Sequence, residues 1–351
     1  MKKIASLLAA AAFLMPMATQ AQSVQGTSYF LPKTVLKFHL LVEKTTFKPG
    51  ELAEYANKYM KLNNVGTEAN TSYKIVGINI EKTSVPDSSK MFTALIDKKH
   101  SIFSVKRTDE GILQAINAEG EAREVYKPFT PSAKKKAVNA KDFMNQEILS
   151  AGSSAKMAQL IAQDIYEIRE SRNDLSRGNA EYMPKDGAQL KIMLSNLDTQ
   201  EKALMQVFTG TTEKDTTEHV ITFVPEKAAD HITLFRFSKK LGLVDADDLA
   251  GEPYYINIAD EHIIPELPLE AQTDEKKKDK DNCGVYVNLP GKINISVNNS
   301  QNELMTAEIY AAQFGRTESI SGELFGRKLT THLVVDAITG NAKSLKVEPI
   351  E

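Results

Sequence analysis

The sequence predicts a strand-rich α+β fold, because runs of alternating apolar and polar residues lie toward both ends of the chain and two amphipathic helical stretches lie in its middle. Of the 351 residues, 42% are hydrophobic and 25% are charged, which is typical of a soluble globular protein with a sizeable core. We expect an N-terminal α+β domain, a central helical hairpin and a C-terminal β-sandwich-like domain. The predicted limits are a signal peptide at 1–21, the first domain at 22–129, a linker at 130–152, the helical hairpin at 153–205 and the last domain at 206–351.

The first residues have the three parts of a cleavable export signal. Lys2 and Lys3 supply positive charge, residues 4–15 form an apolar run, and Thr19 and Ala21 place small side chains around a cleavage site. The apolar run is too short for a membrane-spanning helix, which needs about 20 residues. We therefore predict cleavage near Ala21, a periplasmic or secreted mature protein, and no membrane span once the signal is removed.

In the N-terminal domain, alternation predicts a strand at 35–42, and apolar residues on one face predict a short helix at 52–60. Further short strands are expected at 75–80, 91–96, 102–106 and 112–116. In the first strand, His39 shares a face with Lys37 and Glu43. We therefore expect the His39 side chain to face water.

The middle of the chain is predicted to form two helices joined as a hairpin. Ser153 or Ser154 can cap the start of the first helix, and Gly178 is expected to end it. Asp186 and Gly187 are expected to begin the second helix. Each apolar stripe must pack against the partner helix or against a neighbouring sheet.

Short strands divided by turn residues predict the C-terminal sandwich. We expect a hairpin whose strands, 206–209 and 218–224, flank a turn at 210–217. Pro290-Gly291 is expected to turn the chain between two further strands, and the charged segment 273–282 is expected to be a surface loop. The other predicted strands are 231–237, 254–258, 285–289, 293–297, 303–310, 329–335 and 345–347.

A charge-dense stretch of the first helix contains Arg169 and Arg172. Guanidinium groups bind carboxylates and phosphates through paired N–H donors, so these two residues are the candidate ligand-binding site. The alternative is a salt-bridge network or a solvated helix face.

The acidic residues Asp245, Asp247 and Asp248 resemble the start of a calcium-binding loop and are the candidate metal ligands. Leu249 occupies the next ligand position and Gly251 comes one residue late, so a solvated acidic turn is the alternative. The sequence contains no zinc motif, phosphate loop or dinucleotide fingerprint, and we expect no cofactor.

The net charge and the cysteine content indicate which partners and which disulfides the chain can have. The formal net charge is -3, which argues against a nucleic-acid partner. Cys283 is the single cysteine, so an intramolecular disulfide is excluded. We expect a buried or loop thiol, with an intermolecular disulfide as the alternative.

Several segments together resemble an uncharacterised family of exported Bacteroidetes proteins, a domain of unknown function of similar length. The segments that carry the resemblance are 31–34, 47–50, 55–59, 169–172, 186–187, 208–210, 235–238, 242–243, 251–253, 312–315 and 339–340. The chain departs from the family pattern at Val287 and Asn288, where an aromatic and a basic residue are usual. The resemblance implies export and a common fold, and it brings no catalytic residues with it.

The residues favour a non-enzymatic envelope protein that binds or helps assemble another component, either an envelope protein or a glycan. Trp is absent, which weakens the glycan version because indole is the largest side-chain face for stacking on a sugar. The alternative function is a hydrolase that acts on envelope polymers through paired carboxylates, such as those of residues 245–248 or Glu252.

Overall fold

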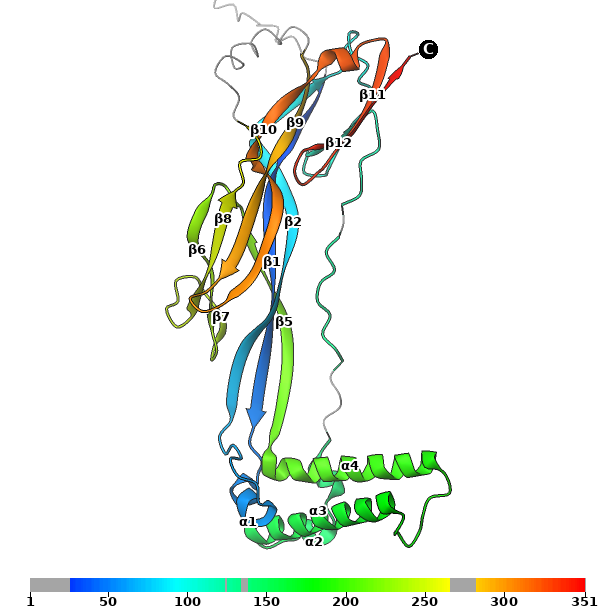
Figure 1. The fold of residues 1–351 in the computed structure, drawn as a ribbon, viewed down its shortest axis with the longest axis vertical. Coiled ribbons are helices and arrows are strands. Elements are labelled where there is room, and N and C mark those ends of the chain that lie inside the picture. The colour runs from blue at the N-terminus through cyan, green and yellow to red at the C-terminus, as the bar shows by residue number, and fades with distance from the viewer. Residues whose placement is uncertain (1–25, 124, 134–137, 266–281, 351) are drawn as a thin grey trace, which may run out of the picture.

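The computed structural model describes residues 26–123, 125–133, 138–265 and 282–350 (Figure 1). It confirms the predicted α+β class: the chain is strand-rich, and a helical hairpin interrupts the strands. The predicted signal peptide and nearly all of the predicted charged loop lie outside the described residues. No helix in the described part of the chain has both the length and the apolar character that a bilayer crossing needs.

Two antiparallel sheets pack face to face in the body of the molecule. The first sheet has the order β2-β1-β5, so β1 is paired along both of its edges. The second sheet has the order β10-β9-β8-β6-β7. Their bounds are β1 Gly26–Lys48, β2 Asn70–Leu95, β5 Thr211–Phe223, β6 Ala229–Ser238, β7 Gly242–Val244, β8 Glu252–Asp260, β9 Asn282–Asn298 and β10 Glu303–Ser321.

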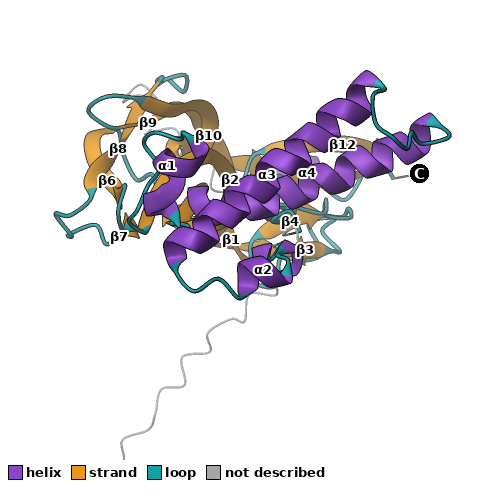
Figure 2. Cartoon of the chain, turned by 90° about the horizontal axis from the view of Figure 1, so that it is seen from below, coloured by secondary structure: helices purple, strands orange, loops and turns teal. Residues whose placement is uncertain are grey.

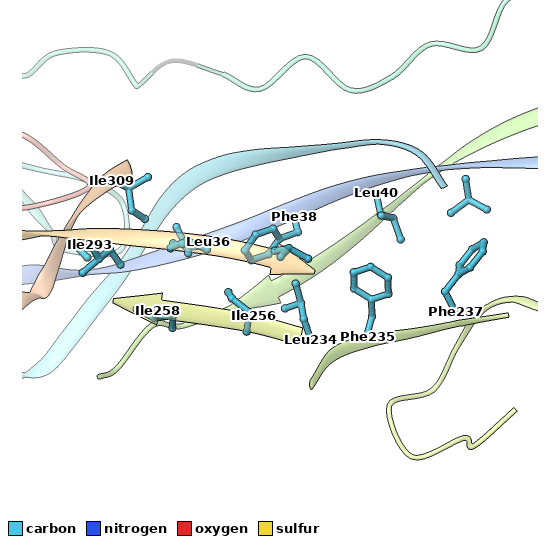
Figure 3. Close-up of a cluster of buried hydrophobic side chains, with 14 residues drawn as sticks. Leu36, Phe38, Leu40, Leu234, Phe235, Phe237, Ile256, Ile258, Ile293 and Ile309 are labelled. Carbon is cyan, nitrogen blue, oxygen red and sulfur yellow. The ribbon is translucent and has the colours of Figure 1, made fainter. Parts of the chain in front are cut away.

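Alternate side chains of β1 fill the space between these sheets (Figure 3). Leu36, Phe38 and Leu40 point from β1 toward the second sheet, because successive strand residues point to opposite faces. The buried residues that meet them are Leu234, Phe235, Phe237, Ile256, Ile258, Ile293, Ile295, Val297, Ile309 and Ala311. Lys37 and His39, which lie between these positions, therefore belong to the outer face of the first sheet.

A third sheet, of order β12-β11-β4-β3, packs at the end of the body that carries the C-terminus (Figure 1). Its strands are β3 Val105–Arg107, β4 Leu113–Ile116, β11 Leu329–Val335 and β12 Ala342–Pro349. They enclose a second core with the first residues of β1, such as Tyr29 and Leu31, and with Cys283 and Val285 of β9. The same long strands β1 and β9 thus serve two cores.

The described helices other than η4 (Gly322–Phe325), which contributes Phe325 to the second core, gather at the opposite end of the molecule, where the two longest lie across the direction of the strands (Figure 1). They are η1 Ala53–Tyr55, α1 Ala56–Met60, η2 Ala140–Phe143, α2 Gln146–Leu149, α3 Ser154–Arg177 and α4 Gly187–Thr209. Their core contains Leu52, Met60, Ile148, Ile161, Ile165, Leu204 and Phe208. Seen from this end, α3 and α4 form a hairpin that projects beyond the sheets (Figure 2).

The predicted ends of the two long helices are confirmed. The Ser153 side chain accepts a hydrogen bond from the Lys156 amide, and Asp186 accepts one from the Gln189 amide. Gly178 ends α3 with φ 76°, a left-handed conformation that glycine adopts without steric cost.

Strands from both sides of the helical hairpin share sheets. β1 pairs with β5 over residues 36–48 and 211–223, and β4 pairs with β11. The face-to-face packing likewise joins an N-terminal sheet to a C-terminal one. The limits of the predicted domains therefore do not coincide with the limits of the sheets.

Two local predictions are wrong. Residues 206–209 belong to α4, and 210–217 do not form a hairpin turn, because β5 begins at Thr211. The apolar residues taken as a strand are instead the buried face of the last helical turn, which includes Val207 and Phe208.

Pro290-Gly291 is also not a turn, because β9 runs through it. The register of β9 against β10 shifts here, between Ala311 and Arg316. A Cβ on Gly291 would lie 2.1 Å from the Phe314 carbonyl oxygen, so the two backbones approach closely enough to need glycine.

An extended connection runs from β4 back to the helical end along the outer side of the first sheet (Figures 1 and 3). We call residues 118–133 of this connection the strap; residue 124 lies outside the described residues. The strap has no regular secondary structure and meets the sheet through side chains.

Replacing Phe38 with alanine tests the packing of the two facing sheets. Phe38 is fully buried between them, and removing a buried aromatic side chain costs about 3–5 kcal/mol in the free energy of unfolding. Chemical denaturation of Phe38→Ala should show a loss of this size. Leu249→Ala is the control, because Leu249 is 84% exposed and should change stability by less than about 0.5 kcal/mol. Equal losses in both variants would contradict the assignment of this core.

Candidate functional site

The predicted arginine pair joins the two long helices to each other. Arg169 Nε lies 2.6 Å from Glu201 Oε1. Arg172 Nη1 lies 2.5 Å from Glu201 Oε2 and 3.0 Å from Asp198 Oδ1. Both guanidinium groups are thus engaged by carboxylates of α4. This arrangement is the salt-bridge network that the sequence offered as the alternative. The ligand-binding role of Arg169 and Arg172 stays a prediction.

The hydrogen bond from Arg172 is the main cause that holds the pKa of Asp198 below its ordinary value, and Lys202 adds to the effect. Asp198 therefore stays ionised at neutral pH and, with Glu201, completes the interaction between α3 and α4. Arg169 also lies 5.6 Å from the ring centre of Tyr166, in a cation–π arrangement.

The three predicted calcium ligands lie in the turn between β7 and β8. The Asp248 amide donates to the Asp245 carbonyl oxygen, and the Asp248 carboxylate accepts from the Ala250 amide, so these contacts close the turn. Across the described residues, no group of three or more His, Cys, Asp and Glu side chains could hold a metal ion. The geometry of this turn adds no support for a calcium site, which stays a prediction from the sequence.

The outer face of the first sheet carries a polar cluster around His39. His39 Nδ1 lies 2.8 Å from Glu218 Oε1 on β5, and Nε2 lies 3.1 Å from Glu81 Oε2 on β2. The Tyr126 ring of the strap stacks on the imidazole, with ring centres 3.6 Å apart. Only 5% of His39 is exposed. The prediction that His39 faces water is therefore wrong, because the strap covers the face on which it lies.

Glu218 joins the strap to the sheet. Its Oε1 accepts a hydrogen bond of 2.8 Å from the Tyr126 hydroxyl, and its Oε2 accepts one of 2.9 Å from the Phe129 amide. Burial by itself would raise the pKa of Glu218, but the hydrogen bonds from Tyr126, Phe129 and His39 outweigh it and lower that pKa. Burial and the nearby Glu218 carboxylate raise the pKa of the Tyr126 hydroxyl, which therefore stays protonated and donates.

A pocket of about 390 Å³ opens beside this cluster, between the strap and the sheet. Lys37, Glu81 and Thr83 line it from the sheet, and Tyr126 and Arg123 line it from the strap. Both ring nitrogens of His39 are already engaged by carboxylates. The cluster is arranged to hold the strap on the sheet.

Cys283 lies in the second core and is fully buried, which confirms the expectation of a buried thiol. Burial is the main cause that raises its pKa, so it is a poor nucleophile. Its Sγ lies 3.9 Å from the Ile320 carbonyl oxygen.

The projecting end of the helical hairpin exposes apolar side chains. Tyr182 is 81% exposed and Ile192 is 61% exposed, and Met183 and Met193 are exposed beside them. None of the four belongs to the helical core. The sequence could not show that these side chains are exposed. A helix that packs on a partner helix and one that packs on a sheet have the same apolar periodicity.

Comparison with known families places nearly the whole chain in one family. Residues 25–343 match the family described as Domain of unknown function (DUF4831). The chain belongs to this family. The resemblance to an uncharacterised domain family is thereby confirmed, whereas export and a Bacteroidetes origin stay predictions. No curated protein and no solved structure matches the chain.

The contribution of the helix–helix ion pairs can be measured with Glu201→Gln, which keeps the side-chain shape but removes the charge that both arginines contact. We expect the free energy of unfolding to fall by about 1 kcal/mol, since the arginines are partly solvated. Chemical denaturation at low and high salt should show a smaller loss at high salt.

The control for this measurement is Glu170→Gln, on the exposed side of the same helix α3. It should change stability by less than about 0.5 kcal/mol. A Glu201→Gln variant as stable as this control would show that the ion pairs do not hold the hairpin together.

Proposed function

We propose that the protein is an exported, non-enzymatic binding module that contacts a protein partner through the projecting end of its helical hairpin. The observation that carries the proposal is the set of apolar side chains exposed there: Tyr182, Met183, Ile192 and Met193. Exposed apolar side chains that lie together at one end of an element are typical of protein–protein contact sites.

The projecting hairpin can contact a partner protein away from the sheets. The hairpin lies across the direction of the strands and projects beyond the sheets (Figures 1 and 2). The caps at Ser153 and Asp186 and the ion pairs of Glu201 fix its two helices. A surface that is already ordered loses little conformational entropy on binding.

The chemistry of the surface favours a protein over a glycan. Three of its four apolar residues are Met or Ile, and methionine adapts its unbranched side chain to varied apolar partners. Tyr182 is the one aromatic ring among these four side chains that could stack on a sugar.

The hydrolase alternative gains no specific support. Residues 245, 247, 248 and Glu252 line neither the pocket beside the strap nor the pocket of about 150 Å³ between β1 and α4. Glu252 accepts a hydrogen bond from the Ser300 hydroxyl.

Cross-linking and affinity capture from cells of the native host, with the full-length tagged protein, test the proposed contact. Wild type should recover the same partner protein reproducibly, and Tyr182→Ser with Ile192→Ser should recover at least about tenfold less, the effect of losing two apolar anchors. Leu249→Ser is the matched control, since Leu249 is equally exposed but lies in the turn after β7. Unchanged capture by the hairpin variant, or no reproducible partner for wild type, would contradict the proposal.

Export is tested separately by fractionating the same cells and determining the N-terminus of the protein. The charged start, the apolar run and the small residues before Gln22 support cleavage at Ala21. We expect the mature chain to begin at Gln22 and to be found outside the cytoplasm. A chain in the cytoplasm that retains Lys2 and Lys3 would contradict this prediction.

A further inference from the structure

Strand β12 forms one edge of the third sheet, and none of the described strands pairs with its outer side (Figure 1). On its inner side it pairs with β11. The strap contacts β12 at Lys343, which pairs with Glu121 near the turn that joins β11 to β12. Beyond this contact, all residues from 345 to 350 are exposed. This stretch of the edge is therefore open to another strand.

The unpaired backbone groups of β12 belong to alternate residues. The Ile350 amide donates to the Lys328 carbonyl oxygen, just before β11, so the backbone groups of Ile350 point toward β11. In an antiparallel pair this direction alternates from one residue to the next. Leu345 and Val347 therefore each present an N–H and a C=O outward. Pro349 presents only its C=O, because proline has no N–H.

The apolar side of β12 is only partly covered. Leu345 lies opposite Leu333 of β11, and residues opposite each other point to the same face of a sheet. Val347 lies opposite Thr331 in the same way. Both β11 residues are fully buried, but Leu345 is 44% exposed and Val347 is 40% exposed. Side chains on the buried face of the sheet thus reach solvent at this edge.

The other side of β12 carries one charge of each sign. Lys346 and Glu348 alternate with the apolar residues and are exposed. A lysine on an edge strand opposes pairing with another strand, unless a carboxylate lies across from it. If two copies of β12 run antiparallel with Val347 opposite Val347, each Lys346 lies opposite the Glu348 of the other copy. Registers centred on Leu345 or Pro349 do not bring these charges together.

We propose that β12 is a docking edge for a second copy of this chain, with the two strands antiparallel about a two-fold axis at Val347. The Val347 N–H of each copy donates to the Val347 C=O of the other. The Leu345 N–H donates to the C=O of Pro349, which ends the pairing because it returns no N–H. The two third sheets become one continuous sheet, and the contact uses the same surface of both copies, as a two-fold interface requires.

The contact is small, so the dimer is weak. It is formed by one short strand from each copy, and interfaces below the standard size belong to transient complexes. We expect a dissociation constant between about 10 µM and about 1 mM. This edge lies in the third sheet, at the opposite end of the molecule from the helices (Figure 1). The proposal is therefore independent of the contact proposed for the hairpin.

Sedimentation equilibrium of the protein purified from its native host, at concentrations up to about 1 mM, tests the dimer. Wild type should pass from monomer to dimer as its concentration rises. Lys346→Glu sets two carboxylates against each other at both charge pairs, and Glu348→Lys sets two ammonium groups there. Either variant should self-associate at least about tenfold more weakly than wild type. An equal mixture of the two variants restores opposite charges at both positions, so it should form a mixed dimer about as strong as that of wild type.

The matched control is Lys240→Glu, which makes the same change of charge in the exposed turn between β6 and β7. It should dimerise as wild type does. Tyr182→Ser with Ile192→Ser should also keep the dimer, which separates this proposal from the one for the hairpin. Circular dichroism of each variant verifies that it is folded. The proposal would be overturned by a wild type that stays monomeric, by single variants that dimerise like wild type, or by a mixture no stronger than either variant alone.

Discussion

The pairing of β1 along both of its edges is the constraint on which the rest of the structure depends. Its 23 residues hydrogen-bond to β2 on one side and, from Leu36 onward, to β5 on the other. Its start packs in the core of the third sheet, and its middle packs between the two facing sheets. Each sheet and the helical end are therefore positioned relative to one strand.

The positions of β1 that are buried in a core differ between its start and its middle. Tyr29 and Leu31 point into one core, whereas Leu36 and Phe38 point into the other, so the buried face shifts from odd to even positions. The register with β2 slips between Phe30 and Pro32, where this change begins. An extra residue in one strand reverses which side chains face inward, and a single long strand can thus face two cores.

Charged groups near the protein surface are used here to hold elements together. Glu201 receives both arginines of α3, and Glu218 receives the strap and the imidazole of His39. In each case one carboxylate contacts two side chains from elements other than its own. Among the described residues, no buried side-chain nitrogen or oxygen lacks a hydrogen-bond partner, as expected when desolvated polar groups must be compensated.

The hairpin and the strap place two different kinds of surface on one scaffold. The hairpin end exposes four large apolar side chains beyond the sheets, whereas the pocket under the strap is lined in part by charged side chains, such as Lys37 and Glu81 of the sheet. The contacts that hold the strap and those that fix the hairpin both end on a glutamate carboxylate, Glu218 in the first case and Glu201 in the second.

The sequence by itself determined the class of the fold and the helix ends at Gly178 and Asp186, with Ser153 as one of two candidate caps, because propensity and capping are local properties. It could not determine that β1 pairs with β5 or β4 with β11, since these pairings join residues far apart in the chain. For the same reason, alternation correctly placed His39 on the polar face of its strand but could not show that the strap covers that face. Only the tertiary structure brought Glu81, Glu218 and Tyr126 around His39, because each comes from a different segment and contributes through a side chain.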